Sequence, residues 1–176
     1  GLKWENVDLV HGTITIDRQM QYQEGLIKLV SLKTRNARRT VYMSDKLKTY
    51  FLHLEQERKV QAATQTAQRA QNQTFIIDID GKQISSLELV NSLPNGKIQT
   101  VNSLKYHSRT IKSELGINFK YHHLRHTYGT RLAEMNTPTH ILCNQMGHAS
   151  GKVTERYYLA VSKPGIELLT KNLNAM

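Results

Sequence analysis

The stretch that decides the fold is His122-His123-Leu124-Arg125-His126-Thr127, which is followed by Gly147-His148 and then by Tyr157. A tyrosine can attack phosphorus, an arginine can hold anionic oxygens, and histidines can donate hydrogen bonds or move protons. His122 and Arg125 are three residues apart, so on a helix they share a face. The pattern therefore indicates a site for phosphodiester chemistry that works without a metal ion.

Helix signals surround this stretch. The apolar spacing and the turn residues predict helices over 122–135, over 137–146 with a start at Thr137-Pro138, and over a segment capped by Thr154 that carries Tyr157. Gly147 is expected to end the second of these helices. After Pro164, a short amphipathic tail is predicted, and its apolar face consists of Ile166, Leu168, Leu169 and Leu173.

Strand signals lie in the first quarter of the chain. Apolar and polar residues alternate in Gly12–Ile16, Leu26–Val30 and Thr40–Met43. Glu24-Gly25 is expected to turn the chain between the first two segments, and the basic stretch from Lys33 to Arg39 between the last two. These segments predict a small three-stranded antiparallel sheet with a charged hairpin at one end.

The middle of the chain predicts further helices. Ser44 can cap a helix that continues to Arg58, and the low-complexity Gln/Ala stretch 61–73 is either an exposed extension of it, which we favour, or a surface excursion. No recognition role follows from this stretch. The remaining expected elements are a buried segment with Phe75–Ile77 and Ile79, a helix over Leu87–Leu93 capped by Ser85 or Ser86, and a helix over Val101–Leu115 ended by Gly116.

Charge predicts the partner. The chain has 176 residues, the length of one domain, and its 24 Lys+Arg against 14 Asp+Glu give a net charge of +10. The positive charge is concentrated between Arg18 and Arg39, because Glu24 is the only acidic residue in this segment. Its cations are Lys33, Arg35, Arg38 and Arg39. We expect them to contact a phosphate backbone, with binding that weakens steeply as salt rises.

Several protein classes are disfavoured. Cys143 is the only cysteine, so the chain has no disulfide framework and no cysteine metal site, which suits a reducing compartment. No apolar run approaches the length of a membrane span. Arg125 lies inside the histidine cluster and acids are scarce near it, so a metal site is not expected there. A soluble, cytoplasmic protein without a metal or cofactor is predicted.

The ordered motifs resemble the H-x-x-R, G-H and tyrosine boxes of the tyrosine recombinases, the phage integrase family. Gly1–Asp8 resembles the family segment that enters the small sheet, and Leu32–Val41 is similar to the basic hairpin that bears the catalytic lysine. The resemblance implies an α+β, mainly helical catalytic-domain fold over 1–176. It also implies that a further catalytic arginine and a separate N-terminal DNA-binding domain would precede Gly1.

The resemblance assigns roles to five residues. Tyr157 is the candidate nucleophile, with Tyr158 as its neighbour and rival, and Arg125 would hold nonbridging oxygens of the scissile phosphate. His122 would take the tyrosine proton or bond the phosphate, and His148 would donate to a phosphate oxygen. Lys33 would give a proton to the leaving 5′ oxygen.

Neighbouring residues receive other roles. His123 and His126 could be mistaken for His122, but only His122 has the three-residue spacing to Arg125. His126 is expected to pack or cap behind the site. Arg35, Arg38 and Arg39 are expected to contact phosphates, as is Lys33.

The resemblance also implies a reaction. It is site-specific recombination of double-stranded DNA through a 3′-phosphotyrosine link, for integration or excision of a phage or mobile element in a bacterial cell. The family acts as a tetramer on DNA, and the predicted tail could dock on a neighbouring subunit. Two alternatives stay open, namely a type IB topoisomerase-like enzyme and a DNA-binding module that has lost catalysis.

Overall fold

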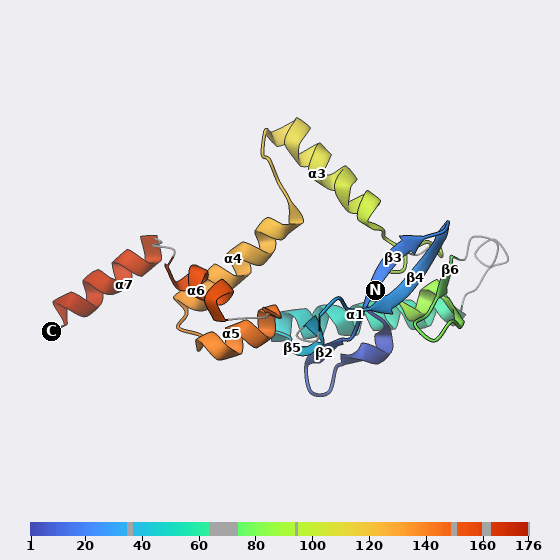
Figure 1. Ribbon diagram of the computed structural model, residues 1–176, viewed down its shortest axis with the longest axis horizontal. Helices are drawn as coiled ribbons and strands as arrows, with labels where there is room; N and C mark the ends of the chain where they lie inside the picture. Colours follow the sequence, from blue (N-terminus) through green and yellow to red (C-terminus); the bar gives the residue numbers. More distant parts are fainter. Residues whose placement is uncertain (35–36, 64–73, 94, 149–150, 160–162, 176) are drawn as a thin grey trace. The chain divides into compact units, whose positions relative to one another are not determined.

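The computed structural model describes residues 1–34, 37–63, 74–93, 95–148, 151–159 and 163–175 (Figure 1). They form two compact units, Gly1–Tyr106 and His107–Met176, and each is described by itself. All strands that the structure describes belong to the first unit, while helices make up the second. The predicted α+β class is confirmed.

The first unit contains two small sheets. One is antiparallel with the order β1-β2-β5, from Val7–Asp8, Thr13–Ile16 and Arg39–Tyr42. The other has the order β3-β4-β6-β7, from Arg18–Gln23, Leu26–Ser31, Phe75–Ile77 and Gln83–Ser85. In this second sheet β6 runs parallel to β4, with Ile27 opposite Ile76, although residues 32–74 separate the two strands in sequence.

The composition of the predicted sheet was wrong. Leu26–Val30 does not lie between the first and third predicted strands; it is β4 of the second sheet and pairs with β3. Glu24-Gly25 therefore turns the chain from β3 to β4. The missed strand β3 also alternates, because Gln19, Gln21 and Gln23 interleave with Met20, which packs on the core. Strand β3 was not predicted from the sequence because most of its residues are polar and only one face of the strand packs on the core.

Buried apolar residues join the second sheet to the segment that follows it. Leu29, Ile76, Leu89 and Ile98 form the core cluster, and Leu89 is fully buried. The predicted helix over Leu87–Leu93 was wrong, because only Ser86–Glu88 forms a short 3-10 helix, η3, capped by Ser85. Leu89 then enters the core in extended conformation and forms a bridge with Lys3. Phe75 and Ile79, expected to be buried, are exposed.

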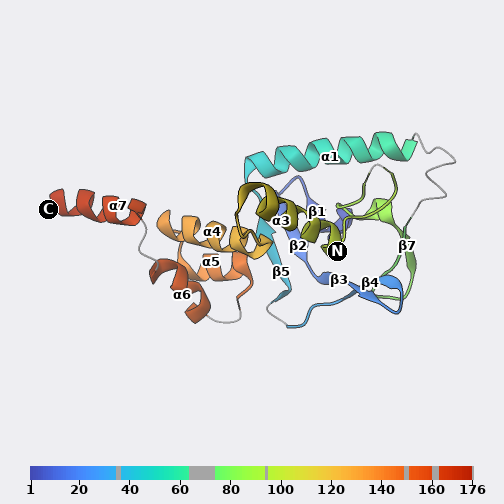
Figure 2. The same ribbon diagram turned by 90° about the horizontal axis from the view of Figure 1, so that it is seen from above.

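Helix α1, Asp45–Ala63, begins after Ser44 as predicted and extends along one side of the strands (Figure 2). Phe51 is buried and meets the edge of Trp4 at 6.1 Å between ring centroids. The guanidinium of Arg58 lies 5.3 Å from the centre of the same Trp4 ring. The 3-10 helix η1, Trp4–Asn6, is thus held to α1 by aromatic and cation–π contacts. Of the Gln/Ala stretch, residues 64–73 lie outside the described chain.

A buried ion cluster lies beside this core. The Lys3 ammonium lies 2.9 Å from an Asp78 carboxylate oxygen, and both side chains are 9% exposed. Arg18 donates to Asp78 at 3.0 Å and to Asp17 at 2.9 Å. Burial raises the pKa of Asp78, but the Lys3 bond, the Ile79 N–H and the charges of Lys3 and Arg18 outweigh it, so the pKa is lowered from its ordinary 3.8.

Replacing Asp78 with asparagine should lower the unfolding free energy at neutral pH by about 3 kcal/mol, because Lys3 and Arg18 lose their buried counter-charge and keep only the exposed Glu5 as a shared partner. The lowered pKa means that this stabilisation is present above pH 3.8 and is lost as pH falls through the folded-state value. Urea unfolding followed by Trp4 fluorescence measures the effect. Asp80→Asn, which breaks an exposed pair with Lys82, is the control and should change stability much less. Equal effects of the two variants would contradict a stabilising role for the buried cluster.

Helix α3, Val101–Leu115, begins in the first unit and continues into the second, and it ends at Gly116 as predicted. The second unit then contains α4 (Tyr121–Glu134), α5 (Thr139–Met146), α6 (Gly151–Leu159) and α7 (Lys163–Asn174). Helices α4, α5 and α6 pack against one another, and their core includes Ala133, Leu142 and Met146. None of the helices in the described chain combines the length and the apolar content that a membrane crossing needs.

Candidate active site

One face of α4 carries both the helix packing and the candidate arginine. Arg125, Gly129 and Ala133 are spaced by four residues, so they form a stripe along the helix. Gly129 and Ala133 are buried, and Ala133 packs on Leu142 and Met146 of α5. Their small side chains let α4 approach its neighbours closely. Arg125 is therefore positioned at the end of a packed stripe and is only half-exposed.

The Arg125 guanidinium reaches the end of α5. Its Nη2 donates a hydrogen bond to the backbone carbonyl of Met146, the last residue of that helix. A guanidinium carries five N–H donors, and this bond uses one of them. The bond fixes the planar group beside Gly147-His148, two residues that follow Met146 directly. The structure thus brings the H-x-x-R and G-H motifs together.

Gly147 and His148 end helix α5 in a defined geometry. Gly147 has φ 68°, a left-handed conformation that glycine adopts without a Cβ penalty, as predicted for the end of this helix. The His148 N–H donates to the Cys143 carbonyl at 3.1 Å. The Cys143 thiol donates in turn to the His148 carbonyl at 3.4 Å. The backbone of His148 is therefore held on both sides.

The His148 ring is held by helix α6. Its Nδ1 lies 2.8 Å from the hydroxyl oxygen of Thr154, a residue with no exposed surface. The sequence-based prediction of Thr154 as a helix cap was wrong, because α6 begins at Gly151 and Thr154 lies inside it. Because α6 begins three residues before Thr154, the Thr154 hydroxyl does not cap the helix and instead contacts the His148 ring. Sequence reasoning missed this contact, although Thr154 stands only three residues before Tyr157.

The three histidines of α4 are exposed: His122, His123 and His126. His122 is exposed, and its ring meets the edge of His126 at 4.8 Å between centroids. This spacing of four residues places the two rings on one side of the helix. His126 is exposed, so the expectation that it packs behind the site was wrong. The hydroxyl of Thr127 donates to the carbonyl of His123.

The structure describes only some of the remaining candidate side chains. Tyr157 and Tyr158 belong to α6, and their side chains lie outside the described part of the chain. Lys33 is exposed in the link between β4 and β5 and belongs to the first unit, whereas the other four catalytic candidates belong to the second. In the same link Arg38 is exposed and Arg35 lies outside the described residues. Arg39, the first residue of β5, is half-buried and donates to the Ala37 carbonyl at 2.9 Å.

Metal-binding side chains do not gather in the described chain. Within residues 1–34, 37–63, 74–93, 95–148, 151–159 and 163–175, no group of three or more His, Cys, Asp or Glu side chains is placed to hold a metal ion.

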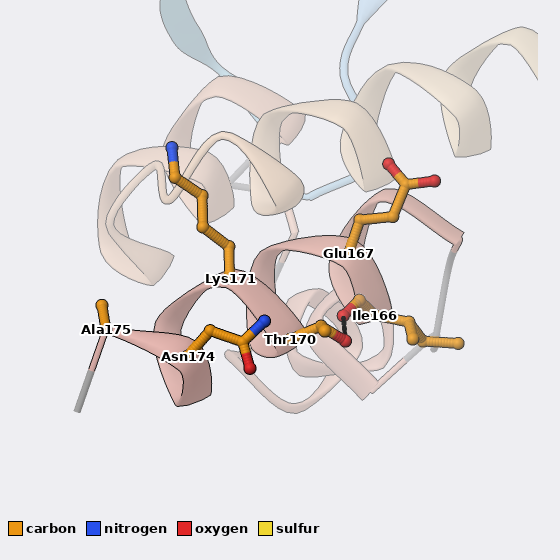
Figure 3. A pocket seen from close by; sticks show the side chains of 6 residues that line it. All are labelled: Ile166, Glu167, Thr170, Lys171, Asn174 and Ala175. Carbon is orange, nitrogen blue, oxygen red and sulfur yellow. Dashed lines mark hydrogen bonds between the residues drawn. The ribbon is translucent and has the colours of Figure 1, made fainter.

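Helix α7 forms the predicted amphipathic tail. The exposed fractions of Ile166, Leu169 and Leu173 are 51%, 57% and 60%, and the side chain of Leu168 lies outside the description. The Thr170 hydroxyl donates to the Ile166 carbonyl at 2.9 Å (Figure 3). An open hollow runs along this helix, and its lining residues are Ile166, Glu167, Thr170, Lys171, Asn174 and Ala175.

Comparison with known proteins identifies a similar curated protein and similar solved structures. A protein described as "Tyrosine recombinase XerC-like", from Caldanaerobacter subterraneus subsp. tengcongensis, is 25% identical over an alignment 174 residues long, and the alignment covers 92% of this chain and 41% of that protein. The chain thus spans less than half the length of this relative.

The fold is similar to that of solved recombinases. An integrase of the transposon Tn1549, in complex with transposon right end DNA, matches with a TM-score of 0.70 and 19% identity, over 99% of this chain and 53% of that one. The XerA recombinase matches with a TM-score of 0.60 and 17% identity, over 97% and 50% of the chains. The model of the "Phage integrase family" matches residues 1–163. The chain therefore belongs to the phage integrase family.

Proposed function

We propose that the full-length gene product containing this chain is a site-specific DNA recombinase. It cleaves and rejoins DNA strands through a 3′-phosphotyrosine intermediate and so integrates or excises a phage or mobile element. The observation that carries this proposal is the meeting of Arg125 with the end of α5, directly before His148, on a unit whose helix α6 bears Tyr157. The anion-binding Arg125 comes from α4, the His148 imidazole lies just after the end of α5, and Tyr157 belongs to α6; these three helices pack against one another.

Phosphate binding is the first proposed step. Arg125 offers a planar fork that matches two nonbridging oxygens of a phosphodiester, and its bond to the Met146 carbonyl orients that fork in advance. His148 donates to a phosphate oxygen. These donors stabilise the additional negative charge of the pentacoordinate transition state, where hydrogen bonds strengthen most.

Strand cleavage is the second proposed step. The Tyr157 oxygen forms a bond to phosphorus while the bond from phosphorus to the 5′ oxygen breaks. The phenol proton, with an ordinary pKa of about 10, passes to His122, and Lys33 supplies a proton to the leaving 5′ oxygen. The number of phosphoester bonds is unchanged, so a 5′-hydroxyl of a partner strand reverses the step without ATP.

DNA contacts outside the reacting phosphate follow from charge. The basic link between β4 and β5 exposes Lys33 and Arg38, which suits contact with the DNA backbone. The fold similarity to an integrase in complex with transposon right end DNA supports DNA as the partner. Because the proposed substrate is DNA, the proposed place of action is the bacterial cytoplasm.

A tetramer on DNA is proposed for the full-length protein. The exposed apolar residues Ile166, Leu169 and Leu173 of α7 support this assembly, because a helix with such a face gains stability when it docks on another surface. A neighbouring subunit in the assembly is the proposed surface.

The test uses a nicked suicide DNA substrate, from which the short cleaved fragment diffuses away and leaves the protein attached. The full-length protein should give a covalent adduct, and peptide mapping should locate the phosphotyrosine at Tyr157. Addition of a partner strand with a 5′-hydroxyl should release recombinant DNA. Rejoining that is confined to the original strand would indicate a topoisomerase-like enzyme instead, and DNA binding with no adduct would indicate a module without catalysis.

A further inference from the structure

We propose that Thr154 is a positioning residue that sets the orientation and the tautomer of His148 and ties this histidine to the helix bearing Tyr157. The inference rests on the proposed function, because it concerns the group that donates to the scissile phosphate. The Thr154 hydroxyl does not touch the DNA in this proposal. It acts through the imidazole.

Burial is the first observation. Thr154 has no exposed surface, and its hydroxyl oxygen lies 2.8 Å from Nδ1 of His148. A buried hydroxyl without a partner would cost free energy, so this bond is a constraint and not an incidental surface contact. The surrounding helices α4, α5 and α6 pack against one another and hold Thr154 in place.

Backbone geometry is the second observation. The His148 N–H and carbonyl are both bonded to Cys143, so the position of its Cα is fixed by the end of α5. The remaining freedom of the residue is rotation about its side-chain bonds. The Thr154 bond removes that freedom and engages Nδ1, so donation to a phosphate has to come from Nε2.

Proton placement follows from these two constraints. For a neutral His148 to donate from Nε2, the proton must reside on Nε2 and Nδ1 must accept a hydrogen bond. The Thr154 hydroxyl is able to donate that bond, as partners of metal-bound histidines also fix the ring by bonding the second nitrogen. A hydroxyl, unlike a carboxylate, does this without favouring the charged imidazolium. In this arrangement the Nε2–H of a neutral His148 is the donor to the phosphate.

Position in the helix links two catalytic parts. Thr154 precedes Tyr157 by three residues, so both stand within one turn of α6. A displacement of α6 that moves the tyrosine also moves the hydroxyl that orients His148. Engagement of the phosphate and placement of the nucleophile are thus mechanically connected.

The test compares Thr154→Val, which keeps the shape and deletes the hydroxyl, with Thr154→Ser, which restores it. At saturating DNA, the valine variant should form the covalent adduct about 10- to 100-fold more slowly, a range typical when an orienting hydrogen-bond partner is lost. DNA affinity should be unchanged, and serine should restore most of the rate. Thr49→Val is the control, because it deletes an exposed hydroxyl that bonds its own helix α1. An unchanged rate in the valine variant overturns the proposal.

Nitrogen NMR of histidine gives a readout that a purely structural role would not move. His148, assigned by comparison with His148→Gln, should be the Nε2–H tautomer in the wild-type protein and a tautomer mixture in Thr154→Val. An Nδ1–H tautomer in the wild-type protein overturns the proposal, even if the valine variant fails to fold. If the wild-type protein forms no adduct while the tautomer shift occurs, the proposed function fails and the positioning role stands.

Discussion

Replacing Tyr157 with phenylalanine should abolish the covalent protein–DNA adduct on a nicked suicide substrate, while DNA binding persists. Phenylalanine keeps the ring and removes the only atom that can bond to phosphorus, so the loss is chemical and complete. The measurement is an adduct band on a denaturing gel, together with the affinity for the same DNA at fixed salt. Loss of binding along with the adduct would indicate a structural role for the ring.

Tyr158→Phe is the matched control for this prediction. Tyr157 and Tyr158 are three and four residues after Thr154, so helical geometry places both within one turn of the His148 contact. The spacing of nine residues from His148 favours Tyr157. The Tyr158 variant should therefore keep the adduct. An adduct that survives in the Tyr157 variant and disappears in the Tyr158 variant would reassign the nucleophile to its neighbour.

Replacing Arg125 with alanine should lower the adduct rate at saturating DNA by roughly 10²- to 10³-fold, the effect typical when one preorganised donor to a developing oxyanion is removed. Arg125→Lys should recover little of the rate, because an ammonium cannot reproduce the planar two-pronged contact. The same change also removes the bond to the Met146 carbonyl, so the thermal unfolding of each variant must be measured alongside the kinetics.

Arg131→Ala provides the matched control for charge. Arg131 is an exposed arginine near the other end of the same helix, so its removal costs the same unit of positive charge. Both alanine variants should weaken DNA binding to a similar, salt-dependent extent. Only the Arg125 variant should lose rate once the DNA is saturating. Equal rate losses in both variants would mean that Arg125 contributes only general electrostatic attraction.

The sequence predicted the helices that carry the candidate residues, because these helices follow strong local signals. The spacing of His122 and Arg125 and the glycine at 147 anticipated α4 and the end of α5. The hydrogen bond from Arg125 to the Met146 carbonyl could not be predicted, since every residue has a backbone carbonyl and the sequence does not mark which one accepts. Thr154 was misread because threonine favours helix caps, and nothing local revealed that α6 begins at Gly151.

The strands were harder to predict because pairing is a long-range property. Local alternation marked β2, β4 and β5, yet it does not state which strand lies beside which. Which strands join which sheet depends on the packing of Leu29, Ile76 and Leu89, which come from distant segments of the chain and form one core. Similarly, the Lys3–Asp78 ion pair joins residues 75 positions apart in the sequence, and no local pattern predicts it.

The parallel pairing of β4 with β6 has a consequence for the order of assembly. The β3–β4 hairpin can close as soon as it is synthesised, but its inner edge has to wait until residues 75–77 emerge. During that interval the edge of β4 offers unsatisfied amides and carbonyls to any other strand, including that of a second nascent chain. A truncation placed within residues 64–73 would make this transient condition permanent. A C-terminally truncated fragment of this protein should therefore end after Ile98, so that it contains the whole core cluster.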